Sequence, residues 1–187
     1  MADAAKTEAL IRADDWRMDC LTVVKKTGLP DWLIVAGFVR NLIWDHLHGK
    51  TMATPLNDVD VAIFDPRDLT PAMEQDIESI LRHMRPDVRW QVRNQARMHL
   101  RNGHAPYRNT TDAISYYPEL ETCIGVRLNS ASRVEVVAPL GFEHNWKLSI
   151  APNPKARYEQ SVFRSRVKNK RWLETWPALR VEDPYEI

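Results

Sequence analysis

The chain has 187 residues, of which 44% are apolar and 27% charged, and its 26 basic and 25 acidic residues leave a formal net charge of +1. These proportions are typical of a globular protein and exclude a disordered or collagen-like chain. A charge this close to zero also excludes a protein whose whole surface is built to coat nucleic acid.

The first part of the sequence predicts two helices separated by a short apolar run. Apolar side chains recur at steps of three or four over residues 7–26, which indicates one helix that ends before Gly28. Residues 32–35 are apolar and form a strand or a loop. A second helix follows over residues 37–47, and Gly49 ends it.

The middle of the sequence alternates between strand and helix. Residues 56–64 are short, rich in β-branched side chains and nearly apolar, so we predict a buried strand. A Thr-Pro pair begins a helix over residues 70–85. Residues 88–93 alternate between apolar and polar side chains, as a half-buried strand does, and residues 94–99 fit either a strand or a helix.

The last part of the sequence predicts a hairpin and an irregular tail. Residues 110–117 form a short helix, and residues 123–128 and 133–138 form a β-hairpin. Residues 151–187 are basic and rich in proline, and we expect loops there with one helix near residues 158–172. Two tryptophans at helical spacing can pin this tail to the rest of the protein: Trp172 and Trp176.

The whole pattern predicts one domain over residues 1–187. Helices alternate with three or four strands, so we expect the mixed α/β (α+β) class, a small mixed sheet with helices mainly on one face. The longest apolar stretch is residues 32–38, whereas a membrane span needs about 20 apolar residues, so no membrane partner is expected. No signal peptide is evident, and Cys20 and Cys123 have no motif spacing, so we expect a cytoplasmic protein with free thiols.

Two aspartates in the predicted strand over residues 56–64 are the most informative feature. Asp58 and Asp60 are two residues apart, and such side chains project to the same side of a strand. Like charges are costly to bury side by side unless a cation neutralises them, and carboxylate oxygens suit Mg²⁺ or Mn²⁺. A solvated pair at an exposed strand end is the alternative, because a lone Asp-x-Asp is common.

A glycine upstream of this pair marks a second feature. Gly37 lets the backbone approach a ligand closely, and the amino terminus of the helix that follows presents N–H groups and the positive end of a dipole. Arg40 adds a planar fork of donors that suits phosphate. A helix start that binds anions beside a strand that binds cations is what a nucleoside triphosphate with Mg²⁺ requires. A packing glycine and a surface ion pair are the alternatives.

Several segments around these residues resemble the polymerase-beta-like nucleotidyltransferase superfamily. They are Gly37-Phe38-Val39-Arg40-Asn41, Trp44-Asp45-His46-Leu47 and Pro55-Leu56-Asn57-Asp58-Val59-Asp60-Val61. Within the superfamily the sequence is most similar to a bacterial family of small nucleotidyltransferases, and the resemblance extends over about residues 32–176. Phe38 departs from the superfamily pattern, which usually has Ser or Gly there, so phosphate binding would depend on the backbone and Arg40.

The resemblance implies a metal-dependent enzyme that moves a nucleoside monophosphate from a nucleoside triphosphate to an acceptor hydroxyl and releases pyrophosphate. It implies Mg²⁺ as the cofactor, or Mn²⁺ in its place, bound by Asp58 and Asp60. It implies a nucleotide site formed by Gly37, Phe38, Arg40 and Asn41. The acceptor is left open between a small molecule, a protein and RNA.

The superfamily fold also implies a third carboxylate on a neighbouring strand. Glu135 lies in the predicted strand over residues 133–138 and is the candidate for this catalytic and metal-binding role. An ion pair of Glu135 with Arg127 or Arg133, or a position on an exposed strand face, is the alternative.

The resemblance suggests a pocket for the acceptor or the base, formed by Asn94, Gln95, Arg97 and His99. A polar strand face or a helix cap is the alternative for these residues. The basic tail would suit a phosphate-rich acceptor, but a solvated helix face is the simpler interpretation of its positive charge. That charge comes from Arg157, Arg164, Arg166, Lys168, Lys170 and Arg171.

Two other functions fit the same residues. A non-catalytic nucleotide- or RNA-binding regulatory module on the same fold is favoured by Phe38 and by the open question of the third carboxylate. An enzyme that modifies RNA ends is suggested by the similarity of the Gly-x-Val-Arg segment to transfer-RNA nucleotide-adding enzymes. We rank this last, because the sequence lacks the large helical RNA-binding portion that such enzymes carry.

Overall fold

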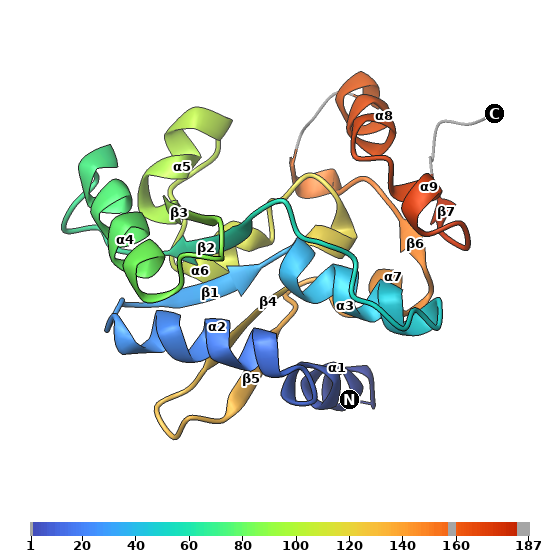
Figure 1. Ribbon diagram of the computed structural model, residues 1–187. Coiled ribbons are helices and arrows are strands. Elements are labelled where there is room, and N and C mark those ends of the chain that lie inside the picture. Colours follow the sequence, from blue (N-terminus) through green and yellow to red (C-terminus); the bar gives the residue numbers. More distant parts are fainter. Residues whose placement is uncertain (1, 157–159, 183–187) are drawn as a thin grey trace.

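A computed structural model describes residues 2–156 and 160–182 and shows a central five-stranded sheet (Figure 1). Its strand order is β3-β2-β1-β4-β5. Strands β2 and β3 are parallel, and the remaining neighbours are antiparallel. The strands are β1 (Trp32–Val35), β2 (Val59–Ile63), β3 (Trp90–Asn94), β4 (Gly125–Leu128) and β5 (Val134–Val137).

Helices surround this sheet, and a small parallel pair of strands lies near the C-terminus. The helices are α1 (Ala2–Arg12), α2 (Asp15–Lys26), α3 (Gly37–Leu47), α4 (Pro71–Met84), α5 (Gln95–Asn102), α6 (Thr110–Ile114), α7 (Glu143–Trp146), α8 (Gln160–Asn169) and α9 (Trp172–Thr175). Two short 3₁₀ helices are η1 (Leu120–Thr122) and η2 (Pro154–Ala156). The parallel pair consists of β6 (Ser149–Ile150) and β7 (Arg180–Val181).

The two faces of the sheet are covered unequally. Ile34, Val61 and Val126 lie on one face, where they join the main core with side chains from α1 to α4. Leu33 and Ala62 lie on the other face, in a smaller cluster that is covered by α6. The prediction of a mixed sheet with helices mainly on one face is confirmed, and side-chain alternation places Asp60 on the thinly covered face.

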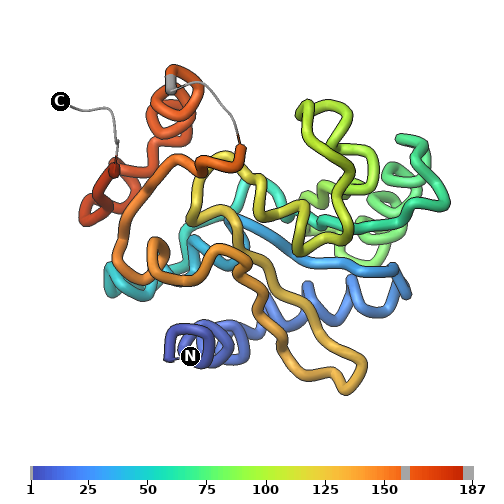
Figure 2. Tube along the Cα trace, turned by 180° about the vertical axis from the view of Figure 1, so that it is seen from behind, coloured from blue at the N-terminus to red at the C-terminus, as the bar shows by residue number. Residues whose placement is uncertain are grey.

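A second apolar cluster attaches the C-terminal segment, which is drawn in orange and red in Figure 2, to α3. Trp44 of α3 is fully buried, with ring centroids 5.8 Å from Trp172 and 5.0 Å from Trp176. The indole Nε1 of Trp176 donates to Asp45 Oδ1 at 2.7 Å. The expectation that these tryptophans pin the tail is therefore confirmed, and α8 and α9 are held close to the start of α3.

The structure corrects several element boundaries. Residues 7–26 are not one helix, because Asp14 caps α2 by accepting a hydrogen bond from Arg17 N at 2.9 Å, and this separates α1 from α2. Asp58 precedes β2 instead of lying inside it. Residues 95–102 are helical, since Asn94 caps α5. Part of the helix predicted near residues 158–172 lies outside the described residues.

Cys20 and Cys123 are free, as expected, and both are buried. Within residues 2–156 and 160–182, no helix combines the length and the apolar composition needed to cross a membrane.

Candidate active site

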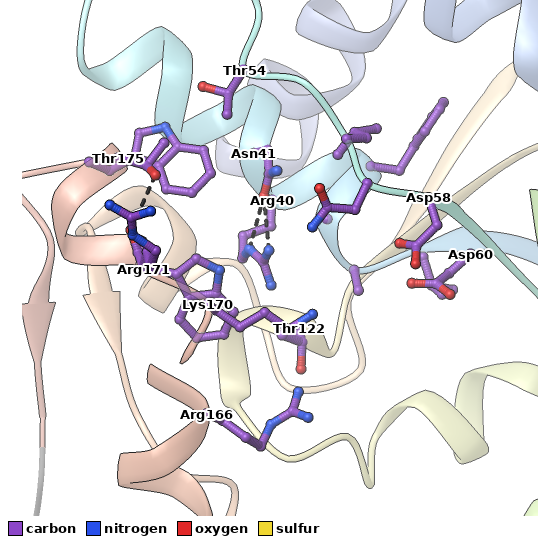
Figure 3. A pocket seen from close by; sticks show the side chains of 18 of the residues that line it. Arg40, Asn41, Thr54, Asp58, Asp60, Thr122, Arg166, Lys170, Arg171 and Thr175 are labelled. Carbon is purple, nitrogen blue, oxygen red and sulfur yellow. Dashed lines mark hydrogen bonds between the residues drawn. The ribbon is translucent and has the colours of Figure 1, made fainter. Parts of the chain in front are cut away.

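A cleft of about 750 Å³ lies between the start of α3, the segment that leads into β2, and the C-terminal helices. The structure brings the predicted aspartates and the predicted nucleotide-binding residues together in its lining. These are Gly37, Phe38, Arg40, Asn41, Asp58 and Asp60. Asp58 and Asp60 form one wall of the cleft, and basic side chains from the C-terminal segment face them from the opposite side (Figure 3).

The aspartate wall carries negative charge that the protein does not fully balance. Burial and the neighbouring Asp58 carboxylate raise the pKa of Asp60 to about 6. Gln91 lies opposite Asp60 on β3, and its amide nitrogen, oriented toward the carboxylate, donates to Asp60 Oδ1 at 2.9 Å. Two adjacent carboxylates, one of them desolvated, are a donor set that fits a hard divalent cation such as Mg²⁺.

The turn between β1 and α3 lines part of the cleft. Ala36 has a φ of +52°, a conformation that L-residues rarely adopt, and its carbonyl accepts a hydrogen bond from Arg40 N at 2.9 Å to begin α3. A Cβ added to Gly37 would lie 3.6 Å from Arg40 and from Leu56, which are ordinary contacts. Packing within the protein therefore does not require a glycine at position 37, and Gly37 itself is part of the cleft lining.

Phe38 contributes backbone instead of a side chain. Its ring is 1% exposed and packs in the main core, 5.9 Å from the Trp16 ring. Its carbonyl accepts a hydrogen bond from Arg17 Nε at 2.8 Å, which holds the first turn of α3 against α2. The missing hydroxyl at this position leaves phosphate binding to the backbone and to nearby cations.

Arg40 is buried between two indole rings. Its guanidinium carbon lies 4.8 Å from the Trp44 ring centroid and 4.6 Å from that of Trp172. Its side chain donates to Asn41 Oδ1 at 2.9 and 3.2 Å, and burial lowers its pKa. The stacked and hydrogen-bonded guanidinium is held in one orientation beside the cleft, and the C-terminal Trp172 forms half of its binding site.

Basic residues of the C-terminal segment complete the wall opposite the aspartates. Arg166 and Lys170 line the cleft, and the positive charge of Lys170 partly offsets the rise in the pKa of Asp60 that burial and Asp58 cause. Glu119, which is fully buried, forms an ion pair with Arg166 and directs it from α8 toward the cleft. The sequence interpretation of the basic tail as a solvated helix face missed these residues. Their four-residue helical spacing, combined with the Trp172 anchor, was the available signal.

The expected third carboxylate does not join the aspartates. Glu135 lies on β5, and β1 and β4 separate β5 from β2, so the two backbones are about 14 Å apart at ordinary strand spacing. Glu135 instead accepts hydrogen bonds at 2.8 and 3.0 Å from Arg127, which lowers its pKa. The structure thus corrects the predicted role of Glu135 and supports the alternative ion pair. Among the described residues, no three or more His, Cys, Asp or Glu side chains are grouped in a way that could hold a metal ion.

The four residues predicted for the acceptor pocket do not line one common cavity. Asn94 is fully buried and binds the backbone of residues 65 and 68 while it caps α5. Arg97 forms a bidentate pair with Glu74 at 2.7 and 3.0 Å. His99 packs against the Tyr107 ring. Only Gln95 of the four lines a cavity described below, and the helix-cap alternative applies to Asn94.

A buried carboxylate close to Arg40 gives the protein a pH-dependent stability. Burial raises the pKa of Glu121 to about 8, and no described residue forms a hydrogen bond with its Oε1. Between pH 4.5 and about 8 the folded protein holds a proton that the unfolded chain has released, so the free energy of unfolding falls as pH rises through that interval.

We expect Glu121→Gln to flatten this pH dependence, because the amide cannot ionise. The slope that is removed is on the order of 1 kcal/mol per pH unit. Urea unfolding at pH 5, 6.5 and 8 measures it, with Asp76→Asn at an exposed position of α4 as the control. An unchanged slope in Glu121→Gln would contradict the assignment.

Comparisons with known proteins agree with this geometry. A family model described as nucleotidyltransferase matches residues 22–181. An NMR structure whose description reports a CCA-adding enzyme head domain has a TM-score of 0.83 and 32% sequence identity, and the match covers 96% of this chain and 95% of that one. A tRNA-processing enzyme complex has a TM-score of 0.50 and 16% identity over 89% of this chain and 44% of the other, which supports the fold alone. No curated protein matches the sequence.

Proposed function

The chain belongs to the nucleotidyltransferase family, and from this premise we propose that it transfers a nucleoside monophosphate from a nucleoside triphosphate to an acceptor hydroxyl and releases pyrophosphate. The observation that carries the proposal is the arrangement of the cleft. Paired carboxylates occupy one wall, cationic side chains occupy the other, and the glycine-led start of α3 lies between them.

Asp58 and Asp60 are the residues that would hold Mg²⁺ in this proposal. When bound, the cation would neutralise phosphate charge and polarise the reacting phosphorus centre. The raised pKa of Asp60 supports the assignment, because a desolvated carboxylate next to another carboxylate gains most from a neighbouring cation. With Glu135 on a distant strand, two carboxylates would serve this role, together with oxygens of the nucleotide and water.

The triphosphate would lie between the start of α3 and the C-terminal segment. Backbone N–H groups of the first helical turn suit a phosphate group, and Gly37, which lines the cleft, lets a ligand approach this backbone closely. Arg40, Arg166 and Lys170 would stabilise the negative charge that develops on the leaving pyrophosphate. Arg40 suits this role because the two indole rings hold its orientation before the nucleotide binds.

For the acceptor we propose the 3′-terminal hydroxyl of an RNA. The sequence alone ranked an enzyme that modifies RNA ends last, but the similarity to a structure described as a CCA-adding enzyme head domain now supports this choice over a small molecule or a protein. The test is incubation with α-³²P-labelled nucleoside triphosphates, one at a time, with Mg²⁺ and with small RNA, purified protein or a metabolite extract. We expect label on the RNA and release of pyrophosphate. Triphosphate binding without any transfer would favour the non-catalytic regulatory module instead.

Removal of one cleft cation gives a further expected result. Lys170→Ala should raise the KM for the triphosphate about tenfold, because a charge-assisted contact to phosphate is lost at a partly hydrated site. Initial rates at varied triphosphate concentration measure this effect. Lys168→Ala is the matched control, since Lys168 is an exposed lysine of the same segment that does not line the cleft. Equal KM values for the two variants would remove Lys170 from the site.

A further inference from the structure

A second cavity adjoins the cleft at Asp60. It has a volume of about 260 Å³ and shares part of its lining with the cleft, namely Val35, Asp60, Tyr117 and Pro118. Asp58 lines the cleft alone, whereas Asp60 lines both cavities. Asp60 therefore stands at the junction of two hollows, one over the start of α3 and the other over β3 and α5.

The proposed reaction requires two binding sites on opposite sides of the reacting phosphorus, and two cavities meet at Asp60. In phosphoryl transfer the attacking and leaving oxygens lie roughly in line, on opposite sides of the phosphorus. The cationic wall with Arg40 and Lys170 places the leaving pyrophosphate in the cleft. An acceptor hydroxyl must then approach from the other side of Asp60, and that is where the second cavity lies.

The lining of the second cavity has the chemistry of a site for a phosphate beside a sugar. Arg93 and Arg101 provide positive charge, and Gln91 and Gln95 provide amide groups. Asp60 is the acidic member of this lining. Arg93 is oriented by an ion pair with Glu78 at 3.2 Å, while Arg101 is exposed on α5.

We infer that this second cavity is the acceptor pocket, and that it receives the terminal nucleotide of the acceptor RNA. The phosphate of that nucleotide lies against Arg101 and Arg93, and its 3′ hydroxyl points toward Asp60. The hydroxyl oxygen forms a bond to the α-phosphorus as the bond to the pyrophosphate oxygen breaks, and the hydroxyl proton leaves to solvent. The volume is smaller than the roughly 300–1,000 Å³ of typical ligand sites, which suits the end of a chain and not a whole folded ligand.

The inference rests on the proposed function, and a binding experiment separates the two. The probe is a fluorescent RNA hairpin with a short single-stranded 3′ end, titrated by anisotropy against the full chain without triphosphate. We expect Arg101→Ala to weaken RNA binding about fivefold to tenfold and Arg101→Glu to weaken it further, because a contact to phosphate is lost or reversed. Arg101→Lys should retain most of the affinity, since it keeps the charge.

Arg82→Ala is the control, because it removes the same charge from an exposed position of α4 that lines neither cavity. Triphosphate affinity, measured by calorimetry with Mg²⁺, should be unchanged in every Arg101 variant. If RNA binding depends on Arg101 but the unaltered protein transfers no nucleotide, the RNA-binding role of the pocket is supported and the proposed transferase activity is refuted. The assignment of the pocket is overturned if the RNA does not bind, or if Arg82→Ala weakens RNA binding as much as Arg101→Ala does. It is also overturned if Arg101→Ala lowers the affinity for the triphosphate and not for RNA, or if ribose 5-phosphate binds to the protein and the RNA does not.

Discussion

Asp60→Asn should lower the rate of nucleotide transfer by about a thousandfold or more and, at the same time, stabilise the protein in the absence of metal. The loss of activity follows because the amide keeps the shape of the side chain but removes the negative charge that would hold Mg²⁺ next to the reacting phosphate. Transfer of ³²P-labelled nucleotide under saturating triphosphate measures the rate. Asp58→Asn is expected to lower the rate of transfer in the same way.

The gain in stability follows from the pKa of Asp60. This pKa is raised from 3.8 to about 6, so the folded protein retains a proton between these pH values that the unfolded chain has lost. The free energy of unfolding of the unaltered protein therefore falls as pH rises from about 4 to 6, and it stays lower at neutral pH. The asparagine variant escapes this loss, which amounts to about 1–3 kcal/mol at pH 7.

Urea unfolding in EDTA at pH 4 and pH 7 measures this difference. Asp76→Asn, at an exposed position of α4, is the control for removing a carboxylate elsewhere. Added Mg²⁺ should stabilise the unaltered protein and not Asp60→Asn. Transfer that stays within tenfold of normal in both aspartate variants would refute the proposed mechanism.

Gly37→Ala should lower the affinity for the triphosphate by at least about thirtyfold and leave the stability of the protein nearly unchanged. The new Cβ would make only ordinary contacts, at 3.6 Å, with Arg40 and Leu56, and alanine is a better helix residue than glycine. The same methyl group would occupy the space in which a phosphate meets the first turn of α3. Calorimetric titration with a non-hydrolysable triphosphate and a thermal unfolding curve measure the two effects.

Gly125→Ala provides the contrasting case. A Cβ at position 125 would lie 3.1 Å from Val35 Cγ1 and 3.3 Å from the carbonyl oxygen of Ile34, so the backbone of β1 or β4 would have to move. We expect this variant to lose stability by about 1–3 kcal/mol, whereas Gly37→Ala does not. Normal triphosphate binding by Gly37→Ala would show that the start of α3 does not hold a phosphate.

Much of the site could be predicted because its signals are local in the sequence. The Asp58-x-Asp60 spacing places two carboxylates on one side of an extended segment wherever that segment lies in the sheet. Gly37 follows the apolar run over residues 32–35, and α3 begins there as predicted. These features depend on neighbouring residues alone, and the structure brings them into one cleft.

The missed features depend on contacts between distant segments. The hairpin that carries Glu135 was predicted, but the position of β5 at the far edge of the sheet depends on which strands pair, and a strand's own residues do not specify this. Asn94 has an amide side chain that could bind a ligand, but this amide forms hydrogen bonds with the backbone of residue 65.

The sequence by itself determined the class of fold, the pair of carboxylates and the helix start beside them, because each follows from the periodicity or spacing of nearby residues. The sequence also predicted that Trp172 and Trp176 pin the tail to the protein, but only the tertiary structure decided that the basic C-terminal segment folds back onto the cleft and that Asp60 borders a second cavity. The physical reason is that Trp172 and Trp176 bury their rings against Trp44 of α3, more than a hundred residues earlier in the chain. That burial, and not any local pattern, places Arg166 and Lys170 opposite the aspartates.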